Sequence, residues 1–165
     1  AAGQYELFSQ WYHSTVRELA THIDWFEDYR VLARLVHPSI TPRQARQSIT
    51  LLQKLKLIKK EKGRWVQTDP EMTTGDTVQS LAVEKFHLQN FNLAGESIDS
   101  IPAQDRDISC LIAAISTSTL DKVKEEIIDF RKKLIALIAA EKNPQRVYHI
   151  SMQLFPTSEA FEPGD

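Results

Sequence analysis

The sequence predicts an α+β fold, in which an N-terminal winged helix is followed by a helix and a β-α-β unit. Within about 65 residues, three amphipathic segments precede a basic hairpin, which is the element order of a winged helix. Farther along, two strand-like apolar segments flank a long amphipathic segment. The charge changes sign between these patterns, so we expect two domains, residues 1–69 and 70–165.

The composition is that of an ordinary soluble protein. Of the 165 residues, 42% are hydrophobic and 25% are charged, which is enough apolar material for one good core or two small ones. The apolar runs, such as residues 134–140, are too short for a membrane span, and no signal peptide opens the chain. We therefore expect a cytoplasmic protein. The single cysteine, Cys110, excludes an internal disulfide, and we expect it to be a small buried residue.

The net charge of −2 conceals an asymmetry. Residues 1–69 carry 11 basic and seven acidic side chains, or +4, whereas residues 70–165 carry nine and 15, or −6. Within residues 38–66, eight basic side chains accompany the single acid Glu61, or +7. A positive field of this kind suits phosphate binding. By charge alone, a solvated helix face with a lysine-rich turn is an equal alternative.

The first two helices are predicted from apolar spacing and from their ends. Residues 5–20 form one amphipathic helix, whose core face holds Phe8, Trp11, Tyr12, Thr15 and Leu19. Asp24 is the expected N-cap of the second helix, with Glu27 three residues later, and His37-Pro38 ends it. The apolar face of the second helix holds Phe26, Tyr29, Leu32, Ala33 and Val36.

The third helix has the clearest start. Thr41 is its expected N-cap, Pro42 suits the first helical position, and Gln44 completes a capping box. Its apolar stripe is Ala45, Ile49, Leu52 and Leu55, with Ser48, Leu51 and Ile58 beside it. The opposite, polar face holds Arg43, Gln47, Thr50 and Lys54, flanked by Arg46. Gly63 then supplies the positive φ of a tight turn, and residues 64–68 return as a strand.

The second half begins after a linker of turn residues, residues 69–76. Asp76 or Thr77 caps a helix that continues to about Ser100, and Pro102 ends it. We expect the tail, residues 156–165, to fray because it has little apolar surface to bury.

A β-α-β unit is predicted after this helix. Residues 107–116 and 146–155 are its strands, and a helix capped by Thr119 runs from Leu120 to about Glu141. A crossover of this length makes the two strands parallel. Two strands leave unpaired edges and a face too small to be stable, so we expect the second half to form a homodimer.

The chain lacks the motifs of an enzyme. It has no phosphate-binding glycine loop, nucleophile elbow or H-E-x-x-H pair. Glu84 and His87 form a single E-x-x-H pair, whereas a di-iron bundle needs two pairs and further carboxylates. Arg106 and Asp107 are expected to make structural contacts, either as an ion pair or by tethering a helix. We therefore expect no enzyme, no metal and no cofactor.

DNA is the partner that the basic third helix and hairpin predict. The candidate readers of base edges or phosphates are Arg43, Arg46, Gln47 and Thr50. The candidate phosphate contacts are Lys54 on the same face and Lys59, Lys60, Lys62 and Arg64 on the wing. Alternatively, the winged helix is structural, and the protein binds an unidentified effector or partner protein. An apolar pocket for that role would be lined by Phe86, Phe91, Met152 and Phe155.

Four blocks carry a family resemblance: FSQWYHSTVREL, residues 40–58, VEKFHLQNFNLAGESIDSIPAQDRDIS and VYHISMQLFP. In these blocks the chain resembles a bacterial family of conserved proteins with a domain of unknown function, labelled as transcriptional regulators. Full-length members carry a helix-turn-helix segment ahead of this region. The resemblance therefore implies that the chain, which opens with Ala1-Ala2-Gly3, is the C-terminal portion of a longer helix-turn-helix protein. It assigns no activity to any residue.

Overall fold

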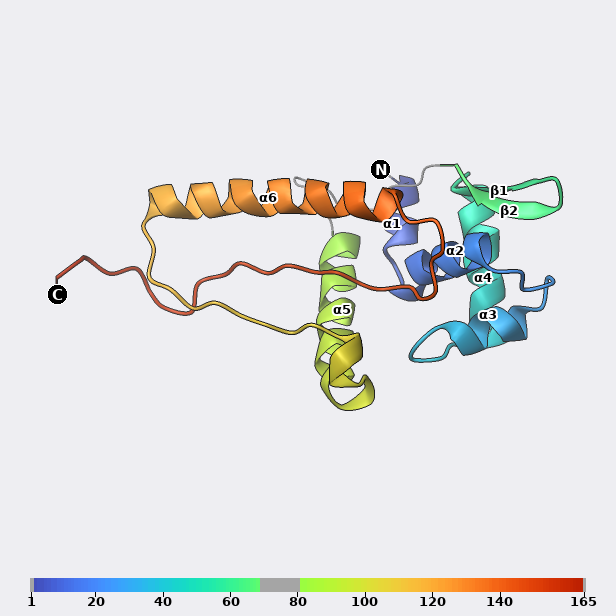
Figure 1. The fold of residues 1–165 in the computed structure, drawn as a ribbon, viewed down its shortest axis with the longest axis horizontal. Helices are drawn as coiled ribbons and strands as arrows, with labels where there is room; N and C mark the ends of the chain where they lie inside the picture. Colours follow the sequence, from blue (N-terminus) through green and yellow to red (C-terminus); the bar gives the residue numbers. More distant parts are fainter. Residues whose placement is uncertain (1, 69–80, 165) are drawn as a thin grey trace. The chain divides into compact units, whose positions relative to one another are not determined.

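The computed structural model describes residues 2–68 and 81–164 (Figure 1). The fold is α+β, as predicted, because helices account for most of the described residues and a two-stranded antiparallel sheet accompanies them. The chain forms two compact units, residues 1–114 and residues 115–165. The predicted linker, residues 69–76, lies outside the described residues, so the domain boundary placed there stays a prediction.

The first predicted helix is in fact two helices. α1 spans Ala2–Leu7 and α2 spans Tyr12–His22. Between them, the Ser9 hydroxyl and amide both donate to the Glu6 carbonyl oxygen, at 2.7 and 3.3 Å. Such local bonds compete with the helical pattern and end α1. Part of the expected core face is confirmed, because Phe8, Tyr12 and Leu19 are buried.

The second predicted helix starts later than expected. α3 spans Tyr29–Leu35, and its N-cap is Asp28, whose carboxylate accepts a backbone amide at 3.0 Å. Asp24 instead accepts from the Phe26 amide at 3.2 Å. Phe26 and the residue after it have φ angles of 53° and 55°, which a right-handed helix excludes. Trp25 therefore enters the core, at 2% exposed, and Phe26 is left 80% exposed.

The third predicted helix begins as expected. α4 spans Pro42–Lys54, and its capping box is complete: the Gln44 amide donates to Thr41 Oγ1 at 3.1 Å, and the Thr41 amide donates to Gln44 Oε1 at 2.8 Å. The buried residues of α4 are Ala45, Ser48, Ile49 and Leu52. The helix ends in a Schellman motif, in which Lys56 has a φ of 58° and carbonyl oxygens of the last turns accept amides at 2.9 Å.

The predicted hairpin follows α4 directly. β1 spans Ile58–Glu61 and β2 spans Arg64–Gln67, paired antiparallel with Ile58 opposite Gln67. The turn residues Lys62 and Gly63 have φ angles of 52° and 76°. Two positive φ angles match the right-handed twist of the strands, as in a type I′ turn. Ile58 is 2% exposed and anchors the hairpin to the core.

A buried polar contact joins α2 to α4. His13 Nδ1 lies 2.8 Å from Ser48 Oγ, and both side chains are buried. Burial lowers the pKa of His13 to about 4, because the charged imidazole would lose its hydration. The ring is therefore neutral at neutral pH, and the serine hydroxyl satisfies one of its nitrogens.

The next helix, α5, packs against α1 and against the residues that link α1 to α2. It spans Leu81–Ser100, and its predicted start at Asp76 or Thr77 lies outside the described residues. The Phe86 ring lies 4.9 Å from the Phe8 ring, and the Trp11 amide donates to Gln89 Oε1 at 2.9 Å. Past the helix, a 3-10 turn spans Ala103–Asp105. The predicted helix tether is confirmed, because the Arg106 guanidinium donates to carbonyl oxygens of residues 101 and 98 at 2.9 and 3.1 Å.

The β-α-β prediction is only partly correct. Its helix, α6, spans Thr117–Ala139 and is capped by Ser116, whose Oγ accepts from the Thr119 amide at 3.2 Å. Residues 107–116 and 146–155 are not strands: in the described chain the sheet consists of β1 and β2. A strand exists only where a neighbour completes its hydrogen-bond ladder. Without that cover, Cys110 is exposed rather than buried.

Candidate nucleic-acid interface

The polar face of α4 is exposed along its length. Arg43, Gln47 and Thr50 are exposed and recur at intervals of four and three residues, so they share one side of the helix. Arg46 is also exposed, and its guanidinium carbon lies 4.7 Å from the centre of the Tyr29 ring. This cation–π contact orients the arginine without neutralising its charge. The buried stripe on the opposite side positions all four side chains.

The tip of the hairpin carries two further exposed cations, Lys62 and Arg64. Among the described residues, no carboxylate pairs with Lys62, Arg64 or Arg43. Their charges therefore remain available to an anion from solution. Lys59, on β1, pairs with Glu61 at 2.9 Å.

Contacts at its base fix the hairpin against the loop before α3. Glu27 Oε1 accepts from Lys60 Nζ at 2.7 Å and from Trp65 Nε1 at 3.0 Å. The Trp65 ring stacks on the Trp25 ring, with centroids 6.3 Å apart. Lys60 Nζ lies over the Trp65 ring, 5.1 Å from its centroid. Gln67 Nε2 also donates across to α2 at 3.0 Å. The wing-like hairpin is thus held in one orientation relative to α4.

Lys54, at the end of the polar face, is tied to α1. Its Nζ lies 3.0 Å from Glu6 Oε2, and both side chains are partly exposed. An exposed pair of this kind contributes about 0–1 kcal/mol to stability. A phosphate can therefore replace the carboxylate at little cost.

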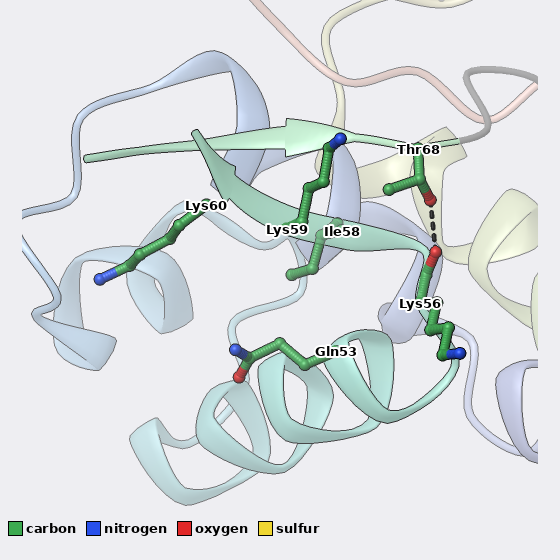
Figure 2. Close-up of a pocket in the computed structure, with 6 residues that line it drawn as sticks. All are labelled: Gln53, Lys56, Ile58, Lys59, Lys60 and Thr68. Carbon is green, nitrogen blue, oxygen red and sulfur yellow. Dashed lines mark hydrogen bonds between the residues drawn. The ribbon is translucent and has the colours of Figure 1, made fainter. Parts of the chain in front are cut away.

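An open hollow of about 520 Å³ lies between the end of α4 and β1 (Figure 2). It is lined by Gln53, Lys56, Ile58, Lys59, Lys60 and Thr68. Figure 2 shows Lys59 and Lys60 leaving β1 in different directions, and Thr68 Oγ1 donating to the Lys56 carbonyl oxygen. Gln53 and Lys56 were not among the predicted site residues. Lys56 was counted among the basic residues of the segment 38–66. Its position beside the hollow, however, depends on the left-handed turn that ends α4, which the sequence did not predict.

The surface of α4 and the hairpin keeps a net positive charge after the contacting carboxylates are counted. Residues 38–66 carry eight basic side chains and one acid, and Glu6 and Glu27 add two contacting carboxylates, which leaves five positive charges. Arginine and glutamine side chains can also donate to base edges. The surface therefore has the chemistry to bind a polyanion and to contact bases.

The predicted alternative pocket draws on both units, because Phe86 and Phe91 lie in the first and Met152 and Phe155 in the second, so it stays a prediction. Phe86 is buried in the first unit, where its ring lies 4.9 Å from that of Phe8. His87 stacks on Phe91 with centroids 6.1 Å apart. In the part of the chain that the structure describes, no three His, Cys, Asp or Glu side chains gather as a metal site requires. None of the described helices combines the length and apolar character of a membrane span.

Fold and surface together define the class, an α+β protein with an exposed basic helix and hairpin. Residues 1–157 match the family described as "Domain of unknown function (DUF4423)", and the chain belongs to that family. The resemblance to a domain of unknown function is thereby confirmed. No curated protein and no solved structure matches the chain.

Proposed function

We propose that this chain is part of a bacterial, cytoplasmic DNA-binding transcriptional regulator. The order α2, α3, α4, β1, β2 is that of a winged helix, with α4 as the recognition helix and the hairpin as the wing. The observation that carries the proposal is the outer face of α4, where Arg43, Gln47 and Thr50 are exposed and the helix contains no acidic residue.

The contacts divide into two kinds. Arg43, Arg46, Gln47 and Thr50 lie where a recognition helix meets base edges in the major groove. The lysines and Arg64 lie where phosphates would pass, and such contacts position the protein without reading sequence. The phosphate contacts are Lys54, Lys59, Lys60, Lys62 and Arg64. Of these, Lys54, Lys59 and Lys60 exchange their carboxylate partners for phosphate oxygens on binding.

Fluorescence anisotropy with a labelled DNA duplex tests the proposal. Affinity should fall steeply between 50 and 200 mM salt, because bound lysines and arginines release counterions from DNA. Lys62→Ala should weaken binding and lower the slope of log K against log salt by about 0.9. Arg43→Ala with Gln47→Ala should reduce discrimination among sequences by more than it changes this slope.

Lys85→Ala, at an exposed position of α5, is the matched control and should leave both affinity and slope unchanged. Binding that ignores salt, or no binding at 50 mM salt, contradicts the proposal.

A second function, a protein-interaction or effector-sensing module, is favoured by a separate observation. Lys54 and Lys60 already pair with Glu6 and Glu27, as structural cations do. If that is their role, Lys60→Ala lowers stability, Glu27→Gln does the same, and DNA affinity does not change. In a DNA-binding protein, Glu27→Gln strengthens DNA binding, because it frees Lys60 and removes a nearby negative charge.

A further inference from the structure

Many apolar side chains between residue 108 and residue 155 are exposed. α6 has no buried residue among its 23 residues. In the segment before it, Leu111 is 91% exposed and Ile112 is 83% exposed; after it, Tyr148 is 59% exposed and Phe155 is 70% exposed. Each such side chain contributes about 1.5–3 kcal/mol when fully buried. A surface of this kind marks an interface.

The apolar seam of α6 is symmetric about its own middle. Intervals of three and four residues separate its members, which are Leu120, Val123, Ile127, Phe130, Leu134 and Leu137. The pattern reads the same in both directions from the point between Ile128 and Asp129. Two antiparallel copies of α6 therefore place each seam residue opposite another, with Ile127 against the partner's Phe130. Phe130 and Leu137 are 52% and 70% exposed and thus accessible to a partner, and the other four seam residues are half-buried.

The charges of α6 match the same arrangement. Residues 117–129 carry four acids and two lysines, or −2, whereas residues 130–139 carry three basic side chains and no acid, or +3. In an antiparallel pair, Glu126 on one flank of the seam lies opposite the partner's Lys133, and on the other flank Lys124 lies opposite the partner's Arg131; each contact occurs twice. The attraction therefore comes from the first flank and from the opposite net charges of the two halves of the helix. A helix that is acidic in one half and basic in the other is complementary to its own reverse.

We infer that a second copy of this chain covers this surface, with the two α6 helices antiparallel across a two-fold axis. Residues 107–116 and 146–155 then become strands, because two copies supply four of them and a stable sheet needs three or more. The dimer also removes the exposed backbone edges of these segments. The inference stands independently of DNA binding.

Sedimentation equilibrium on the full chain is the first test. At tens of micromolar, the mass should be twice 18.9 kDa and should fall towards that of the monomer on dilution. A monomer at every concentration overturns the inference and leaves the surface to a different protein. A series of larger species also overturns it, because a two-fold contact closes at two chains.

Charge reversal tests the antiparallel arrangement. Glu126→Lys alone and Lys133→Glu alone each place like charges opposite one another twice, and each should raise the dimer Kd at least about tenfold. An equimolar mixture of the two variants should restore a heterodimer of wild-type affinity, and so should the double variant as a homodimer. Lys85→Glu on α5 is the control and should leave the Kd unchanged. Single variants that dimerise like the wild type refute the arrangement.

Discussion

The helix-hairpin region and α6 have similar amphipathic sequences but very different packing. Val16, Leu32, Ala45 and Leu52 of the first region are 0% exposed, whereas none of the 23 residues of α6 is buried. In the first region, α2, α3 and α4 present apolar stripes to one another within about 45 residues of chain. Within the described residues of its own unit, 115–164, the stripe of α6 meets no comparable surface. Amphipathicity creates a surface to bury, and only a second element supplies the partner.

The largest expected effect on the free energy of unfolding comes from a core substitution in the first region, compared with a substitution on α6. Leu32→Ala removes a fully buried side chain and should lower the free energy of unfolding by about 3 kcal/mol. Urea unfolding followed by tryptophan fluorescence measures this, because all three tryptophans lie in the first unit. The loss should not depend on protein concentration. Leu137→Ala on α6 is the matched control: it should leave this transition in place and weaken only the dimer.

Protonation of a buried group gives the next effect. His13 has a folded pKa of about 4, below its unfolded value of about 6.5, so the unfolded state binds the proton more tightly between these values. The stability that depends on neutral His13 is complete above pH 6.5 and is lost as the pH falls towards 4, by up to about 3 kcal/mol.

Urea unfolding at pH 7, 6, 5 and 4.5 measures this loss. His13→Gln should flatten the dependence, whereas His22→Gln, at an exposed position of the same helix, should not. An unchanged slope in His13→Gln rules out His13 as the titrating group.

The start of α4 contributes a smaller amount. Thr41→Ala removes the hydroxyl that accepts the Gln44 amide and should cost about 1 kcal/mol of stability. Thr50→Ala, exposed in the middle of the same helix, is the control and should be neutral or slightly stabilising, because alanine has the higher helix propensity. Equal losses in the two variants mean that the cap contributes nothing.

The smallest effect concerns the other end of α4. Lys56 has a φ of 58°, which glycine adopts without steric cost, so Lys56→Gly should raise stability by about 0.5 kcal/mol. Gln47→Gly, exposed in the interior of the same helix, should instead lower it by about 1 kcal/mol. Thermal unfolding of both variants shows whether each one raises or lowers the stability. A stability loss in Lys56→Gly shows that its side chain makes contacts that outweigh the backbone strain.

The sequence predicted those features whose interactions span a few residues. The capping box of Thr41 and Gln44 and the turn at Gly63 follow from neighbours within four positions, and both are confirmed. The start of the second helix was wrong because Asp24 and Asp28 both have the chemistry of an N-cap. The tertiary structure decides between them: Trp25 is buried in the core, and the next two residues have positive φ angles that a right-handed helix excludes.

The candidate site divides in the same way. Helix periodicity was enough to place Arg43, Gln47 and Thr50 on one exposed face. It could not reveal that Lys54 pairs with Glu6, 48 residues away, or that Lys60 pairs with Glu27. Those partners depend on how α1 and the loop before α3 pack against the site.

By itself, the sequence determined the capped start of α4, its buried stripe and the positive φ at Gly63, because each depends on hydrogen bonds and spacing within one segment. The tertiary structure alone decided that α5 packs on α1 and on the residues that link α1 to α2, and that Trp25 rather than Phe26 enters the core. In the tertiary structure, residues 107–116 and 146–155 also have no neighbouring strand to complete a hydrogen-bond ladder within the described chain. The alternating pattern of these segments specifies which side of each would be buried, but a strand forms only where another strand pairs with it.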